Sequence, residues 1–167
     1  MSSSIWSALP QGISRPVVRE SAFWQDYERT ITKPFLHVAI LRYPYLEKIL
    51  AAEKTIESRF SLHRRLPYNR VNKGDVILLK ESGGPIQGVA YVAEVWFYAL
   101  ESGMVERIKR EFGTGLRIDD EAFWLRCEQL NYATLIRLDH VLRIPPIPFI
   151  KRDRNAWATF EPTHSPA

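Results

Sequence analysis

The order of the predicted elements constrains the fold of this chain most. Apolar runs predict strands and helical spacing of apolar residues predicts helices. The strands are predicted over residues 35–41, 55–60, 75–80, 86–98 and 132–144. The helices that follow the first strand are predicted over residues 45–52 and 101–112, and a further helix, capped by Asp119 or Asp120, is predicted to run through Arg126. Strands and helices are interleaved here but do not alternate, which argues against a doubly wound sheet. The order predicts an α+β fold, a small, partly closed mixed β-barrel of about five to six strands with flanking helices.

The 167 residues suggest one domain with a segment on each side of it. We expect residues 1–33 to be an N-terminal extension, 34–145 to form the domain, and 146–167 to be a C-terminal tail that packs on the domain or extends from it. Aromatic residues at helical spacing predict a short helix over residues 21–28 that packs on the domain. In the tail, residues 151–157 interleave basic and aromatic side chains. This segment either clamps single-stranded RNA or folds back and buries its aromatic residues.

Composition and charge narrow the class of protein. The net charge is +4, which weakly favours polyanionic partners. Cys127 is the only cysteine, so no intrachain disulfide can form and a reducing, cytoplasmic compartment is expected. The first eleven residues lack the features of a secretory signal, and no run of about 18 apolar residues predicts a membrane span.

The densest chemistry lies at the start of the second predicted strand. Lys54, Thr55, Glu57 and Arg59 fall within six residues, and burying a core does not require that cluster. Strand geometry puts Thr55, Glu57 and Arg59 on one face, with Lys54 at the start of the strand. These side chains suit a cleft for a nucleobase and its phosphate, because arginine pairs with phosphate and glutamate accepts from an exocyclic amine. The alternative is a ladder of surface ion pairs on an exposed strand, which contributes little stability.

A basic loop follows this strand. Residues 61–73 include Arg64, Arg65, Arg70 and Lys73, which are candidates for contacts with a nucleic-acid backbone. A solvated charged turn is the alternative. Aromatic side chains near the cluster are candidates for stacking on a base: Tyr45, Tyr68 and Trp96.

No metal or cofactor site is expected. The four histidines, His37, His63, His140 and His164, are scattered without ligand spacing. Cys127 lies among apolar residues at helical spacing, which favours a buried and inert thiol. No phosphate-binding loop is present, since the short glycine runs lack a following lysine and hydroxyl residue.

Residues 37–80 resemble an ASCH domain, a branch of the PUA-like superfamily. Pro44 and Tyr45 open the helix after the first strand, and residues 52–59, Ala-Glu-Lys-Thr-Ile-Glu-Ser-Arg, resemble the family pattern Gly-x-Lys-Thr-x-Glu-x-Arg. Residues 73–76, Lys-Gly-Asp-Val, resemble the Gly-Asp that opens the next strand, and residues 91–98 stand where a further strand follows. Ala52 replaces the family's glycine at a helix end. In left-handed backbone, alanine there costs roughly 1 kcal/mol.

The resemblance implies a PUA-like barrel that binds RNA or nucleotides, with the cleft beside Lys54, Glu57 and Arg59. One branch resembles an amidohydrolase on N4-acylated cytidine-type nucleosides, with a lysine, a threonine three residues later and a distal glutamate. Here Lys54 matches the lysine, Glu57 stands at the threonine's position and Thr55 is adjacent. The distal glutamate would be one of Glu101, Glu106 and Glu111.

Three functions therefore remain open. The first is binding of RNA or a nucleotide. The second is an enzyme, the amidohydrolase or a ribonuclease, in which Lys54 activates Thr55 or a water and Glu57 shuttles a proton. The third is a partner-binding module that uses the aromatic residues of the extension, which are Trp6, Phe23, Trp24 and Tyr27.

Overall fold

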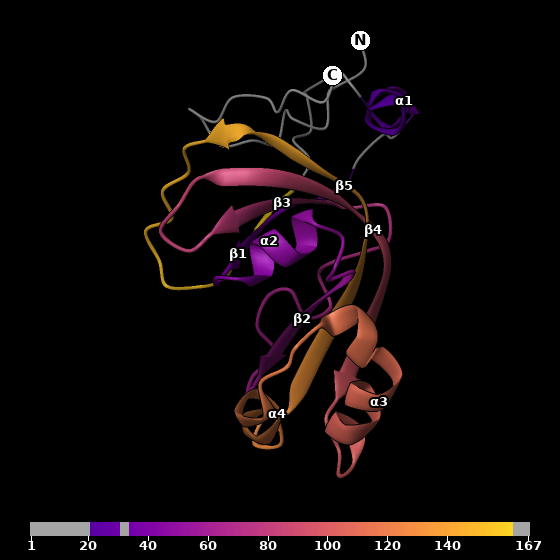
Figure 1. Cartoon of the computed structure of the whole chain (residues 1–167), viewed down its shortest axis with the longest axis vertical. Helices are drawn as coiled ribbons and strands as arrows, with labels where there is room; N and C mark the ends of the chain where they lie inside the picture. The colour runs from indigo at the N-terminus through magenta and orange to yellow at the C-terminus, as the bar shows by residue number, and fades with distance from the viewer. Residues whose placement is uncertain (1–20, 31–33, 162–167) are drawn as a thin grey trace.

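The computed structural model describes residues 21–30 and 34–161 (Figure 1). Its helices are α1 (Ala22–Thr30), α2 (Tyr45–Leu50), α3 (Met104–Leu116) and α4 (Glu121–Cys127). Its strands are β1 (Leu36–Leu41), β2 (Ile56–Ser61), β3 (Val76–Glu81), β4 (Ile86–Ala99), β5 (Tyr132–Ile147) and β6 (Trp157–Phe160). The strands form one six-stranded sheet in the order β2-β5-β4-β3-β1-β6. β1 pairs with β3 in parallel and the other neighbours are antiparallel.

The sheet curls into a half-barrel. Its two longest strands, β4 and β5, run side by side through most of the molecule, and shifts in their register bend them (Figure 1). Helix α2 lies within the curl at one end, while α3 and α4 lie at the other end. The mixed sheet with flanking helices confirms the predicted α+β fold, a small, partly closed barrel of six strands.

Both faces of β1 and β3 are covered, which explains their nearly continuous apolar sequence. On one face, Leu36 and Val38 pack in a cluster with the aromatic side chains of α1. On the other face, Ala39 and Leu41 pack with the apolar side of α2. A third cluster joins α3 and α4 to the outer end of the sheet.

Helix α1 packs on the sheet through its aromatic residues. Trp24 is fully buried, and its Nε1 donates to the His140 carbonyl at 2.9 Å. The Tyr27 hydroxyl is also buried and donates to the Gly74 carbonyl. Trp24 and Tyr27 therefore belong to the core and are not available for a partner, and Trp6 lies outside the described residues.

The Gly-Asp pair before β3 serves the structure. The Asp75 carboxylate accepts the backbone N–H of Phe35 and of Asn72, at 3.1 and 2.7 Å. It also lies 3.0 Å from Nε2 of the buried His37, and since a carboxylate only accepts, that nitrogen donates. His37 Nδ1 then accepts from Trp157 Nε1 at 3.2 Å. This buried network fastens β1 to β3 and to β6.

Two predicted boundaries were wrong at the C-terminal side. Helix α3 does not end at the glycine run but continues through it to Leu116, and Arg117 closes it with a φ of 51°. Strand β5 continues through Pro145 and Pro146 to Ile147. The prolines are tolerated because β2 pairs with β5 only as far as Arg137, so one edge of β5 is unpaired at the prolines.

The sequence also failed to predict β6. The strand pairs with β1 in antiparallel register, and Trp157 is only 2% exposed. The basic-aromatic segment therefore folds back and buries Trp157, one of the two alternatives. The expected tail, residues 146–167, therefore contains the last two residues of β5 and the whole of β6.

Ala52 provides a test of the local backbone. It follows α2 with a φ of 59°, the left-handed conformation in which glycine is favoured. We predict that Ala52→Gly raises the free energy of unfolding by about 1 kcal/mol. Ala51, which has an ordinary φ of −83°, supplies the control, because Ala51→Gly should lower it by about 0.5–1 kcal/mol. Urea titration measures both, and a loss of stability in Ala52→Gly would contradict the prediction.

Candidate functional site

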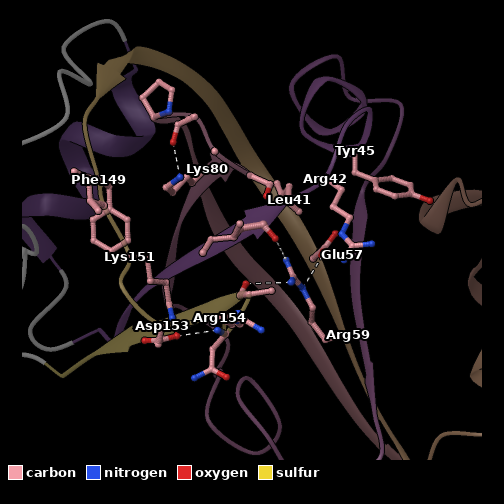
Figure 2. Close-up of a pocket in the computed structure, with 18 of the residues that line it drawn as sticks. Leu41, Arg42, Tyr45, Glu57, Arg59, Lys80, Phe149, Lys151, Asp153 and Arg154 are labelled. Carbon is pink, nitrogen blue, oxygen red and sulfur yellow. Dashed lines mark hydrogen bonds and ion pairs between the residues drawn. The ribbon is translucent and has the colours of Figure 1, made fainter.

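A cavity of about 840 Å³ opens where β1 and β3 end, beside β2 (Figure 2). Its remaining wall is the segment of residues 148–156, which leads from β5 to β6. The residues that carry its chemistry are Arg42, Tyr45, Glu57, Arg59, Lys80, Ser82, Lys151, Asp153 and Arg154. The cavity therefore gathers side chains from both halves of the chain.

The predicted cluster on β2 comes together at this cavity. Glu57 Oε1 lies 2.9 Å from Arg59 Nε, and Glu57 Oε2 lies 3.6 Å from Lys54 Nζ. Lys54 is only 2% exposed and Glu57 only 6%. Burial of both partners does not fit a ladder of surface ion pairs. Glu57 and Arg59 line the cavity, whereas Lys54 lies behind Glu57 and does not line it.

The end of α3 holds Lys54. Its Nζ donates to the Leu116 carbonyl at 2.8 Å, one of the carbonyls that the last turn of a helix leaves without an intrahelical partner. The negative end of the helix dipole favours a cation there. Burial lowers the pKa of Lys54, and the positive charge of Arg59 lowers it further, while Glu57 opposes both effects. Lys54 is therefore placed as a buried counter-ion to the Glu57 carboxylate.

Tyr45 stands on the same side of the cavity. Lys54 Nζ lies 5.4 Å from the centre of its ring, and the ring is half-buried. Burial raises the pKa of Tyr45, and the negative charges of Asp120 and Glu57 raise it further. Tyr45 therefore remains a neutral phenol with an aromatic face and a hydroxyl group.

Arg59 is tied to the backbone around it. Its two terminal nitrogens donate to the carbonyls of Ile40 and Ala156, at 3.0 and 3.1 Å. Its guanidinium also lies 5.3 Å from the Trp157 ring centre. Arg59 Nε is close to Glu57 but makes no hydrogen bond. Arg59 therefore joins β2 to β1 and to the start of β6, and it shapes the cavity wall.

The other predicted residues do not line the cavity. Thr55 is exposed, and its backbone N–H donates to the Gly115 carbonyl at 2.9 Å. Tyr68 packs edge-on against Phe97 and Tyr132. The basic loop is also directed elsewhere: Arg64 lies over the Tyr132 ring, Arg70 pairs with Glu161 at 3.4 Å, and Arg65 and Lys73 are exposed.

Apart from Arg59, the positive charge at the cavity comes from residues that the site prediction missed. Arg42 follows β1, Lys80 lies in β3, and Lys151 and Arg154 lie in the wall segment. The basic composition of residues 151–157 was a signal for the last two. Arg42 and Lys80 carried no signal, because only the pairing of β1 with β3 brings them together.

Two further findings concern the described residues as a whole. Cys127 is buried and its pKa is raised by burial to about 12, as suits an inert thiol. Within residues 21–30 and 34–161, no helix is long and apolar enough to cross a bilayer, and no three His, Cys, Asp or Glu residues gather as metal ligands.

Gly115 lets α3 approach β2 closely enough for Leu116 to reach Lys54. A Cβ at Gly115 would lie 2.8 Å from Ile56 Cδ1 and 2.9 Å from Ile56 Cγ1, closer than real Cβ contacts come. We predict that Gly115→Ala lowers the free energy of unfolding by about 1–3 kcal/mol. Gly113 lies in the same helix with open space around it. Gly113→Ala should therefore raise stability by about 0.5–1 kcal/mol. If thermal or urea unfolding shows the same change in stability for Gly115→Ala and Gly113→Ala, the close packing of α3 on β2 is contradicted.

Comparison with known proteins gives the fold. No protein-family model and no curated protein sequence matches the chain. Among solved structures, the chain is similar to ASCH from Zymomonas mobilis, with a TM-score of 0.54 and 21% identity over 67% of this chain and 72% of that one. The structure of its tyrosine-to-phenylalanine mutant matches with a TM-score of 0.53 and 22% identity, over 66% of this chain and 73% of that one. The structure of its serine-to-alanine mutant matches with a TM-score of 0.54 and 20% identity, over 66% of this chain and 72% of that one. At this identity the similarity establishes the fold alone, and the chain has the fold of that ASCH structure.

Proposed function

We propose that this protein binds single-stranded RNA or a nucleotide, and that the cavity beside Glu57 receives one nucleotide. The observation that carries the proposal is a buried carboxylate, held between Lys54 and Arg59, at the wall of a cavity that five basic side chains line. A volume of about 840 Å³ is within the range of sites for small ligands.

Glu57 is suited to recognise a base. It forms ion pairs with two cationic neighbours, and a carboxylate only accepts hydrogen bonds. A carboxylate has about four lone-pair positions, so it keeps some for a ligand. Cytosine offers an amino donor at N4, and adenine offers one at N6. Uracil has no exocyclic amine, so we expect Glu57 to select against it. The half-buried Tyr45 ring is an aromatic surface for stacking beside the same carboxylate.

The charge around the cavity suits the phosphate groups of the ligand. Five of its lining residues are basic, namely Arg42, Arg59, Lys80, Lys151 and Arg154. Two are acidic, Glu57 and Asp153, and Asp153 is already paired with Lys151. The excess of positive charge attracts a polyanion, and binding should weaken as salt rises.

The base preference gives a direct test with single-stranded decamers of cytidine or uridine, in fluorescence anisotropy at fixed salt. We predict that the protein binds the cytidine oligomer about tenfold more tightly. Glu57→Gln should abolish this preference, because an amide can donate to the uracil carbonyl as well as accept. Glu53→Gln removes the same charge from an exposed residue away from the cavity and should keep the preference. An equal loss of the cytidine preference in both variants, or no binding of either oligomer, would refute the proposal.

An enzyme remains the second candidate, acting on N4-acylated cytidine-type nucleosides or as a ribonuclease. The observation that favours it is a buried lysine of lowered pKa beside a carboxylate and a tyrosine, since such groups cluster at catalytic sites. Because Lys54 does not line the cavity, its role would be to tune Glu57 and Tyr45, and these two would reach the substrate.

Turnover distinguishes the two candidates. If the protein is an enzyme, it will release acetate from N4-acetylcytidine or cleave single-stranded RNA, and Glu57→Gln will lower the rate by about 100-fold or more, as for loss of a general base. Chromatography of the products measures both reactions. If the rates of the unmodified protein match those of Glu57→Gln, the enzyme hypothesis is excluded and the binding proposal stays intact.

A further inference from the structure

A second region of the cavity carries a cation that the base site does not use. Lys80 is only 6% exposed, and its Nζ donates to the carbonyls of Glu81, at 3.1 Å, and of Gly84. In the part of the chain that the structure describes, no carboxylate pairs with this ammonium. An ammonium has three N–H groups, so one donor remains for the cavity that Lys80 lines. A buried cation without a counter-ion is costly, and a bound anion would remove that cost.

The neighbours of Lys80 are also donors. The register of β1 and β3 ends at Leu41 and Glu81, and the Ser82 N–H donates to the Leu41 carbonyl at 2.8 Å. Arg42 and Ser82 are therefore the residues that come directly after this last pair, at the neighbouring ends of the two strands. Both are exposed and line the cavity, and neither side chain has a partner among the described residues. Figure 2 shows Arg42 near Glu57 and Tyr45, with Lys80 beyond Leu41.

The opposite wall adds another free donor and no free acid. Arg154 is exposed, lines the cavity and has no partner within the described residues. The Asp153 carboxylate accepts from Lys151 Nζ and, at 2.8 Å, from the Asn155 backbone N–H. Its charge is therefore balanced within the segment. A free arginine fork, an ammonium and a hydroxyl are the donors that phosphate sites use.

We propose that Lys80, Ser82 and Arg42, with Arg154 facing them, form a phosphate subsite for the nucleotide whose base meets Glu57. This inference rests on the proposed function and makes the preferred ligand a nucleotide with a phosphate monoester, not a nucleoside. Such a group occurs on a free mononucleotide or at the phosphorylated end of an RNA chain. Lys80 is the central contact, because its charge is the buried one.

Calorimetric titration with cytidine, its 5′-monophosphate and its 3′-monophosphate tests the subsite. We expect one of the monophosphates to bind about tenfold more tightly than cytidine. Lys80→Met keeps the length of the side chain and should bring that ratio to about one. Arg42→Gln, a change at the surface, should lower the same ratio and decides the question if Lys80→Met fails to fold. The matched controls, Lys109→Met and Arg110→Gln on α3, should keep the ratio.

A parallel titration separates the two sources of phosphate. A cytidine decamer with a 5′- or 3′-phosphate, compared with the same decamer ending in hydroxyl groups, should show the gain if the subsite takes the end of a chain. A gain for the mononucleotide alone assigns it to free nucleotides, and either result supports the subsite. Equal affinity of cytidine and both monophosphates, together with no gain for either decamer, would overturn it while the base site stands. If none of these ligands binds, both the phosphate subsite and the proposed function are refuted.

Discussion

The site depends on one buried charge, the ammonium of Lys54. A buried lysine needs partners that replace water, and here the partners are the Leu116 carbonyl at the end of α3 and the Glu57 carboxylate. The helix end, the start of β2 and the cavity wall are thereby fixed relative to one another. Glu57 in turn lies against Arg59, which binds the backbone of β1 and the residue before β6. A single chain of polar contacts thus links distant parts of the sheet.

This arrangement separates support from recognition. Lys54 is behind the wall and Arg59 is largely committed to backbone carbonyls, so both position Glu57 more than they offer free donors to a ligand. Among residues 21–30 and 34–161, the free cations of the cavity are the unpaired Arg42 and Arg154 and the partly satisfied Lys80. An anion held between cations at the wall, beside cations without counter-ions, matches the two ends of a nucleotide.

Local patterns predicted the parts of the structure that local physics controls. Tyr45 to Leu50 shows helical spacing and forms α2, and Asp120 caps α4 by accepting the Ala122 N–H. Glu57 and Arg59 share a face because they are two residues apart in a strand. The parallel pairing of β1 with β3 connects distant segments, so no local pattern could predict that Arg42 and Ser82 follow neighbouring strand ends. Similarly, composition identified the basic loop, but whether Arg64 and Arg70 would meet a ligand or Tyr132 and Glu161 depended on the fold.

The most direct measurement is the position of a bound ligand. A crystal structure of the protein soaked with a cytidine nucleotide, or amide chemical-shift mapping in solution, locates it at the level of single residues. The account predicts the base within hydrogen-bonding distance of the Glu57 carboxylate, with shifts concentrated on β2, the end of β1 and residues 148–156. A nucleotide bound on the basic loop or on the outer face of α3, with the cavity unchanged, would contradict it.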